Sequence, residues 1–154
     1  MVKRFDCYVV RHAEAGKRGT VADELRPLSR RGREQADAIA NALADAGITR
    51  LYSSAYTRCV ETLEPLAAIT GMKVRTRDLL AEGNDASGLL DLVESATAPI
   101  ALCSHGDVIE SLLTTLDRRG VPLDDDRAAK GSTWVLTCGR HEIVAAHYVP
   151  PHDR

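Results

Sequence analysis

Two hydrophobicity patterns alternate along this chain of 154 residues. Short apolar runs predict β-strands, and they span residues 6–11, 48–54, 72–76, 100–106, 132–138 and 142–149. Apolar residues at helical spacing predict helices over residues 29–47, 56–70, 87–96 and 107–119. Strands that alternate with helices are typical of an α/β fold with a mostly parallel sheet. The short link at residues 139–141 is of the kind that joins hairpin strands, so we expect an antiparallel strand at the C-terminal edge.

Local signals mark the ends of several predicted helices. Ser29 is a suitable N-cap for the first helix, and Asp107 can cap the last one. Gly71 closes the second helix, which Pro65 should kink or deprive of one hydrogen bond. Residues 14–26 are polar and show no periodicity, so they predict a loop that follows the first strand.

Chemically capable side chains follow four of the predicted strands. They are Arg11-His12, Ser53-Ser54 with Arg58, Glu82, and Ser104-His105. In open α/β sheets, ligands bind outside the carboxyl ends of the strands, at the point where the strand order reverses. We therefore expect these side chains to share one rim of the sheet and to form a site there.

Two histidines and two arginines on one rim indicate an anion site that contains a nucleophile. A neutral imidazole is a competent nucleophile toward phosphorus, and guanidinium groups pair bidentately with phosphate oxygens. Arginines and a second, protonated histidine can stabilise the developing charge without a metal. A carboxylic acid is needed to protonate the leaving oxygen and later to activate water. Glu82 is suitably placed for that role, and Glu14 is the alternative. The residues thus predict phosphoryl transfer without a metal or cofactor.

The order of these motifs resembles the histidine phosphatase (phosphoglycerate-mutase-like) superfamily. The matching stretches are Val10-Arg11-His12-Ala13-Glu14-Ala15, residues 26–36, residues 52–62 and Cys103-Ser104-His105-Gly106. The resemblance covers essentially the whole chain, and the short length is similar to the SixA-type branch, whose named member is a phosphohistidine phosphatase. It implies a three-layer sandwich with helices on both faces of a mostly parallel sheet.

The resemblance also implies a role for each matched residue. His12 would be the phosphorylated nucleophile, and Arg11, Arg58 and His105 would form the phosphate pocket. Glu82 would be the proton donor. The implied activity is metal-independent hydrolysis of a phosphomonoester or phosphoramidate through a phosphohistidine intermediate. A non-catalytic domain that binds a phosphorylated ligand is the alternative of another class, and such a domain would lack a catalytic group.

A second resemblance concerns the substrate. Residues 26–33, 58–67 and 130–136 look like the histidine-phosphatase half of mycobacterial Nudix-fused hydrolases of oxidised guanine nucleotides. That half acts on a nucleoside diphosphate, which would give Lys17, Arg18 and Lys130 a purpose as additional phosphate contacts. Ser54 could also donate to the phosphate. The substrate therefore stays open between a phosphohistidine protein and a nucleoside di- or triphosphate.

Length, net charge and cysteine spacing indicate the number of domains, the location of the protein and the state of its thiols. The length favours a single domain over residues 1–154, and a formal net charge of −2 gives no general attraction to nucleic acid or to membranes. No apolar run approaches the roughly 18 residues of a membrane span, and the N-terminal run is too short for a signal peptide. We therefore expect a cytoplasmic protein. The four cysteines lie far apart without metal-type spacing, which predicts reduced thiols and no metal site.

Overall fold

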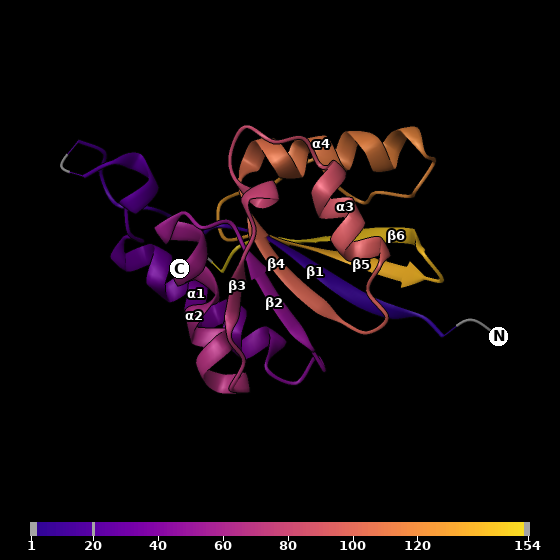
Figure 1. Ribbon diagram of the computed structural model, residues 1–154, viewed down its shortest axis with the longest axis horizontal. Helices are drawn as coiled ribbons and strands as arrows, with labels where there is room; N and C mark the ends of the chain where they lie inside the picture. Colours follow the sequence, from indigo (N-terminus) through magenta and orange to yellow (C-terminus); the bar gives the residue numbers. More distant parts are fainter. Residues whose placement is uncertain (1–2, 20, 153–154) are drawn as a thin grey trace.

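A six-stranded sheet forms the centre of the computed structural model, which describes residues 3–19 and 21–152 (Figure 1). Its strands are β1 (Phe5–Arg11), β2 (Arg50–Ser53), β3 (Val74–Thr76), β4 (Ile100–Ser104), β5 (Thr133–Gly139) and β6 (Glu142–Val149). Their order across the sheet is β3-β2-β4-β1-β5-β6. The first four strands of that order run parallel, whereas β5 pairs antiparallel with both β1 and β6. The expected antiparallel edge is thus a two-stranded hairpin.

Within the described residues, four α-helices cover the two faces of this sheet, and two short 3₁₀ helices lie in the loops. They are α1 (Arg30–Leu43), α2 (Thr57–Thr70), α3 (Ser87–Glu94), α4 (Gly106–Arg118), η1 (Asp23–Leu25) and η2 (Asp78–Leu80). Helices α1 and α2 pack together on one face, and α3 and α4 lie on the other (Figure 1). The three-layer α/β architecture with a mostly parallel sheet is therefore confirmed.

Alternation along the central strand explains why both faces need a helical layer. In β1, Cys7 and Val9 belong to the apolar core under α3 and α4, whereas Val10 belongs to the core under α1 and α2. All three side chains are fully buried. A strand that is apolar on both faces is stable only between two layers, so β1 lies in the interior of the sheet, between β4 and β5. This placement fixes the residues that follow its carboxyl end.

Two predicted helix signals are confirmed in detail. The Ser29 hydroxyl caps α1 by accepting a hydrogen bond from the Gly32 amide at 3.0 Å. Gly71 ends α2 in the left-handed conformation, with φ of 71°. Helix α2 runs through Pro65 as a single element. Because proline has no backbone N–H, the expected loss of one hydrogen bond falls on the carbonyl of Glu61, four residues earlier in the helix.

Two other expectations are corrected. Asp107 does not cap α4, because the N-cap is His105 and Asp107 lies within the first turn. Its carboxylate instead accepts a hydrogen bond from the Gly83 amide at 2.8 Å, which ties the preceding loop to α4. The segment predicted as a plain loop contains η1, and an antiparallel bridge between Ala15 and Leu28 closes the base of that segment.

The cysteines are free thiols, and Cys7, Cys59, Cys103 and Cys138 are all buried. In the described part of the chain, no helix is both long enough and apolar enough to cross a bilayer.

Candidate active site

The pairing of β1 with β4 brings the two predicted histidines together. The strands run parallel, with Arg11 opposite Ser104, so the next residues, His12 and His105, emerge side by side at the same rim. The His12 amide donates to the Ser104 carbonyl at 3.1 Å. The two imidazole rings lie 5.5 Å apart between centroids in an edge-to-face arrangement. Both side chains are buried, with 5% and 1% of their surface exposed, so their hydrogen-bond partners decide their chemistry.

His12 is held as a neutral imidazole. Its Nδ1 lies 2.8 Å from the Ala13 carbonyl oxygen, which can only accept, so Nδ1 carries the proton and Nε2 keeps a free electron pair. Burial lowers the pKa of His12 to about 3, and the neighbouring His105, Arg58 and Arg11 act in the same direction. The Ala13 contact opposes this shift only in part. At neutral pH the Nε2 atom of His12 therefore has a free electron pair and needs no deprotonation before it could act as a nucleophile.

His105 is fixed from one side and open on the other. Its Nε2 lies 2.9 Å from the Ser54 hydroxyl and 3.5 Å from the Cys59 sulfur. The Tyr56 ring packs edge-on against the imidazole, with 4.7 Å between the centroids. On the other side, Nδ1 is buried without a hydrogen-bond partner and lies 3.8 Å from Glu82 Oε1. His105 therefore presents a free ring nitrogen toward the carboxylate of Glu82.

Arg11 is held by contacts that leave part of its guanidinium unused. Its Nη1 donates to the Ala128 carbonyl at 2.7 Å, while Nε is buried without a partner. The side chain passes directly over Gly106, where a β-carbon would come within 2.8 Å of the guanidinium carbon. The glycine that follows His105 thus gives Arg11 the space to lie in the site.

Arg58 stands in the first turn of α2 and is 2% exposed. Its Nη1 donates to the Asp23 backbone carbonyl at 2.8 Å, and its Nη2 donates to the Asp23 carboxylate at 3.2 Å. Glu82 Oε1 lies 3.5 Å from the same Nη2. The guanidinium also stacks over the Tyr56 ring, 4.9 Å from its centroid. Its Nε has no partner.

Unpaired donors gather at this rim. Four buried side-chain polar atoms lack a hydrogen-bond partner within the described residues, and three of them are Arg11 Nε, Arg58 Nε and His105 Nδ1. A buried polar atom without a partner costs about 1–3 kcal/mol, so three on neighbouring residues are a substantial cost to the folded chain. An oxyanion with several acceptor oxygens would satisfy such donors. The arrangement thus suits a phosphoryl group placed next to His12 Nε2.

The two candidate carboxylates differ in what they contact. Glu82 lies within 4 Å of Arg58 and His105, and its side chain is half exposed. Glu14 accepts a hydrogen bond from the Ser29 hydroxyl at 2.9 Å and pairs with Arg31 at 3.7 Å, so it belongs to the start of α1. In the residues that the structure describes, no three His, Cys, Asp or Glu side chains gather to hold a metal ion.

The remaining predicted residues lie elsewhere or play another part. Ser54 is fully buried, and its hydroxyl accepts from the Tyr56 amide at 3.3 Å besides contacting His105, so it lies behind the imidazole. Lys17 and Arg18 are exposed at the start of the loop that carries η1, and the structure gives them no contact with the two histidines. Lys130 is exposed beside Gly131, whose amide donates to the His12 carbonyl at 3.1 Å.

The sequence did not single out Asp23, Tyr56 or Cys59. Tyr56 and Cys59 flank Arg58 in the matching stretch of residues 52–62, and their closeness to Arg58 in sequence could have indicated that they belong to the site. Asp23 gave none, since it lies in a stretch without periodicity.

A family model described as "Histidine phosphatase superfamily (branch 1)" matches residues 7–91. A curated relative from Mycolicibacterium smegmatis, "8-oxo-(d)GTP phosphatase", is 36% identical over 155 aligned positions that cover 94% of this chain. The chain belongs to the histidine phosphatase superfamily. It spans about half (48%) of the length of that relative. The superfamily resemblance found in the sequence is therefore confirmed.

Solved structures of histidine phosphatases share the fold. A SixA protein from Agrobacterium tumefaciens superposes with a TM-score of 0.74 at 20% identity, over 95% of this chain and 98% of that one. A protein histidine phosphatase SixA complexed with tungstate gives a TM-score of 0.75 at 17% identity, over 96% of each chain. At these identities the likeness concerns the fold.

Proposed function

We propose that the chain is a metal-independent phosphatase that forms a phosphohistidine on His12. The observation that carries the proposal is the neutral, buried His12 near three unpaired side-chain nitrogen atoms, Arg11 Nε, Arg58 Nε and His105 Nδ1. The donors would orient a phosphoryl group and stabilise its equatorial oxygens as charge develops. The nucleophile needs no base, because its Nδ1 proton is already held by the Ala13 carbonyl.

In the first step, the Nε2 electron pair of His12 attacks phosphorus, and the bond from phosphorus to the leaving oxygen breaks. Glu82, in its protonated form, gives its proton to that oxygen. In the second step, the Glu82 carboxylate takes a proton from water, and the water oxygen attacks phosphorus. The phosphorus–nitrogen bond then breaks, which returns the electron pair to His12 and releases phosphate. We prefer Glu82 over Glu14 as the acid because it contacts Arg58 and His105.

Ser54 and Cys59 would act through His105. If the Ser54 hydroxyl donates to His105 Nε2, the ring proton resides on Nδ1, where it faces the phosphate site. We therefore assign Ser54 a positioning role in place of the direct phosphate contact expected from the sequence.

For the substrate, we propose a nucleoside di- or triphosphate with a guanine-type base. The support is the sequence relative named 8-oxo-(d)GTP phosphatase, which aligns with nearly the whole of this chain. Lys17 and Arg18 would reach a substrate that extends along the loop that carries η1, and Lys130 would reach one that extends past Gly131.

A phosphohistidine protein is the second candidate, and the charge around Tyr56 favours it. Partial desolvation raises the pKa of the Tyr56 hydroxyl, and the nearby carboxylates of Glu24, Glu82 and Asp23 raise it further, against the effect of Arg58. Three carboxylates at the mouth of the site disfavour additional phosphate groups there. A leaving imidazole, which brings no negative charge, would avoid that repulsion.

Two measurements test the mechanism. Acid-free mass spectrometry of enzyme quenched during turnover should show a phosphate on His12, and His12→Ala should abolish both the adduct and activity, whereas His152→Ala at an exposed histidine should change neither. Phosphate release should persist in EDTA. If His12→Ala stays active, or if EDTA abolishes turnover, the proposed mechanism is wrong.

The substrate is tested by comparing kcat/KM for 8-oxo-guanosine and unmodified guanosine di- and triphosphates with that for a phosphohistidine protein. Preference for the oxidised nucleotides supports the first candidate, and preference for the phosphoprotein supports the second.

A further inference from the structure

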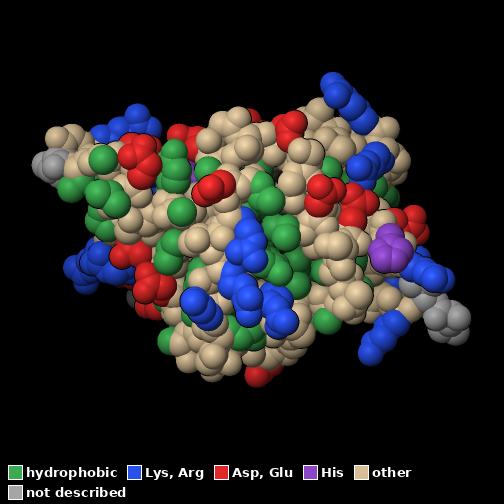
Figure 2. Space-filling model, viewed as in Figure 1, with side chains coloured by type: hydrophobic (Ala, Val, Ile, Leu, Met, Phe, Trp, Pro, Cys, Tyr) green, Lys and Arg blue, Asp and Glu red, His purple; other side chains and the backbone are tan. Residues whose placement is uncertain are grey.

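A row of four cations lies over the two outermost parallel strands of the sheet, β2 and β3. It consists of Arg50 on β2, Arg75 on β3, and Lys73 and Arg77 directly before and after β3, and we call it the basic strip. Figure 2 shows these blue side chains gathered over β2 and β3. Tyr52 is the register partner of Arg75, so these two side chains lie on the same face of the sheet. Side chains two residues apart along an extended strand share a face, which adds Arg50, Lys73 and Arg77 to it.

The basic strip has no acidic counterpart. Arg50 Nη1 and Arg77 Nη1 donate only to the neighbouring Thr49 and Thr76 carbonyls, each at 2.8 Å. Arg77 also lies over the Tyr52 ring, 5.2 Å from its centroid. Among the described residues, no carboxylate forms an ion pair with any of the four cations, although the chain as a whole carries a formal charge of −2. A concentrated, unneutralised positive edge on an acidic protein selects for an acidic ligand.

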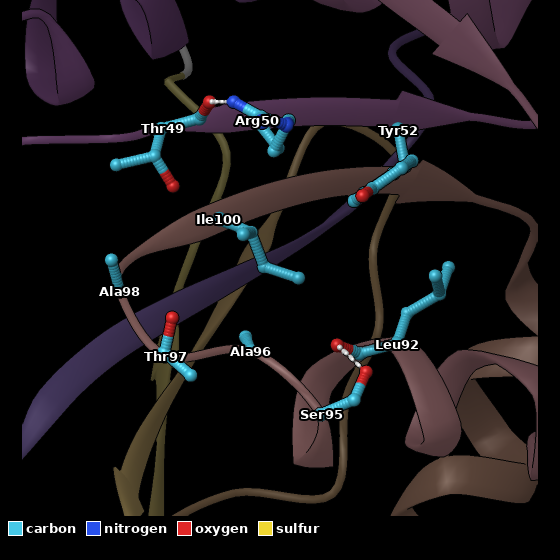
Figure 3. Close-up of a pocket in the computed structure, with 9 residues that line it drawn as sticks. All are labelled: Thr49, Arg50, Tyr52, Leu92, Ser95, Ala96, Thr97, Ala98 and Ile100. Atoms are coloured by element: carbon cyan, nitrogen blue, oxygen red, sulfur yellow. Dashed lines mark hydrogen bonds between the residues drawn. The ribbon is translucent and has the colours of Figure 1, made fainter.

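A hollow adjoins the basic strip at the amino-terminal ends of β2 and β4. It has a volume of about 400 Å³, and Figure 3 shows Arg50, Tyr52, Leu92 and Ile100 around it, with the 95–98 turn closing one side. The catalytic histidines follow the opposite, carboxyl ends of the strands. The hollow therefore belongs to a different surface, on which an apolar side chain could anchor beside the cations.

The edge position of β3 indicates what kind of ligand fits. Strand β3 pairs only with β2, so one side of its backbone has no strand neighbour within the sheet. Extended peptides bind such edges by adding a strand, and their alternate side chains then lie against alternate side chains of the edge. Acidic side chains at every second position would meet Lys73, Arg75 and Arg77 at the same spacing of about 6.6 Å. A nucleic acid is disfavoured, because only four charges face it and the rest of the chain is net negative.

We propose that the basic strip and the adjoining hollow form a docking surface for an extended acidic segment of a partner protein. The segment pairs with the free edge of β3, sets its carboxylates against Lys73, Arg75 and Arg77, and anchors an apolar residue near Tyr52. The hollow lies at the amino-terminal ends of β2 and β4, whereas His12 and His105 follow the carboxyl ends of β1 and β4.

Binding is tested by fluorescence anisotropy at low ionic strength, with a labelled peptide in which Glu alternates with Thr and one Leu is included. A control peptide has the same composition with its Glu residues in one block. We expect the alternating peptide to bind the full chain at least tenfold more tightly than the block peptide. The double variant Lys73→Glu/Arg75→Glu should weaken that binding at least tenfold, and added salt should weaken it further.

The matched control Arg4→Glu/Arg140→Glu makes the same charge change at exposed positions away from β3. We expect it to retain binding within about twofold, which is a small change in binding free energy. Thermal unfolding midpoints and phosphatase activity on a small substrate should be unchanged in both double variants. Equal binding of both peptides, equal loss in both double variants, or no binding at low salt would each overturn the proposal. So would tighter binding of a labelled single-stranded RNA that the β3 variant abolishes.

Discussion

Asp23 holds Arg58 by two different oxygens, its backbone carbonyl at 2.8 Å and its carboxylate at 3.2 Å. This places a negative charge where a phosphate would approach the same guanidinium. Partial desolvation raises the pKa of Asp23, but the Arg58 and Arg26 guanidinium groups lower it overall, so the carboxylate stays charged at neutral pH. The loop that carries η1 thus both supports Arg58 and competes with the anion that Arg58 is expected to bind.

Asp23→Asn should therefore strengthen inhibition by inorganic phosphate by about threefold to tenfold, because a like charge near the phosphate is removed while the backbone contact stays. Competitive inhibition constants measure the effect. Asp37→Asn, which removes the charge of an exposed carboxylate on α1, is the control and should change the constant less than twofold. Weaker phosphate binding in Asp23→Asn would show that the carboxylate mainly holds Arg58 in place.

The buried His12 should make the folded state sensitive to acid. Its folded pKa, about 3, lies below the ordinary value of 6.5, so between these values the unfolded chain binds a proton that the folded chain does not. Stability therefore falls as pH drops below 6.5, and this one group costs about 2 kcal/mol between pH 7 and pH 5. Between pH 7 and pH 5, the free energy of unfolding of His12→Asn should fall by about 2 kcal/mol less than that of the parent chain, as measured by denaturant unfolding. The free energy of unfolding of His152→Asn, at an exposed histidine, should fall by as much as that of the parent chain. If that of His12→Asn also falls by as much as the parent's, the prediction is wrong.

Gly106→Ala should impair catalysis more than folding. The added β-carbon would come within 2.8 Å of the Arg11 guanidinium, whose Nη1 is already held by the Ala128 carbonyl. Because the clash falls on the end of a side chain, we expect Arg11 to be displaced and kcat/KM to drop tenfold or more, about 1.4 kcal/mol of transition-state stabilisation. Gly139→Ala, where a β-carbon meets nothing closer than 3.7 Å, is the control. An unchanged kcat/KM in Gly106→Ala would mean that Arg11 is not part of the phosphate pocket.

Gly32→Ala should impair folding instead. A β-carbon at Gly32 would lie 2.0 Å from the Glu14 carbonyl oxygen, which is backbone and accepts from the Ser29 amide. Since neither group is a flexible side chain, we expect overpacking to cost about 1–3 kcal/mol in the free energy of unfolding. Chemical denaturation measures this, with the exposed Asp37→Ala on the same helix as control. A loss below about 0.5 kcal/mol would show that α1 can shift away from the strand-end loop.

The strand ends were predictable because their signals are local. Val9 and Val10 lead directly into Arg11 and His12, and the short apolar run fixes both the strand and the place where it ends. The position of His105 followed in the same way from β4. The resulting contact between the two histidines depends only on β1 and β4 being parallel neighbours.

Contacts made by irregular segments were not predictable. Asp23 reaches Arg58 across 35 positions of sequence, and the loop that carries it has neither helical nor strand periodicity. Asp107 is of a residue type that often caps helices, yet its carboxylate accepts a hydrogen bond from the Gly83 amide because the loop before α3 folds back onto α4. In both cases tertiary packing overrides the local preference of the residue, and no pattern in one sequence reports that packing.

His12 is tied to the sheet from both sides, since its amide donates to Ser104 and its carbonyl accepts from Gly131, while Arg11 donates to Ser132. The proposed nucleophile is thus fixed by the central strands of the sheet, whereas the groups that would meet the rest of a substrate lie on outlying loops. Residues that carry out the reaction and residues that select the substrate can therefore change independently during evolution. Loops of different length or charge can be exchanged around an unaltered nucleophile, so new substrates can be acquired without rebuilding the catalytic step.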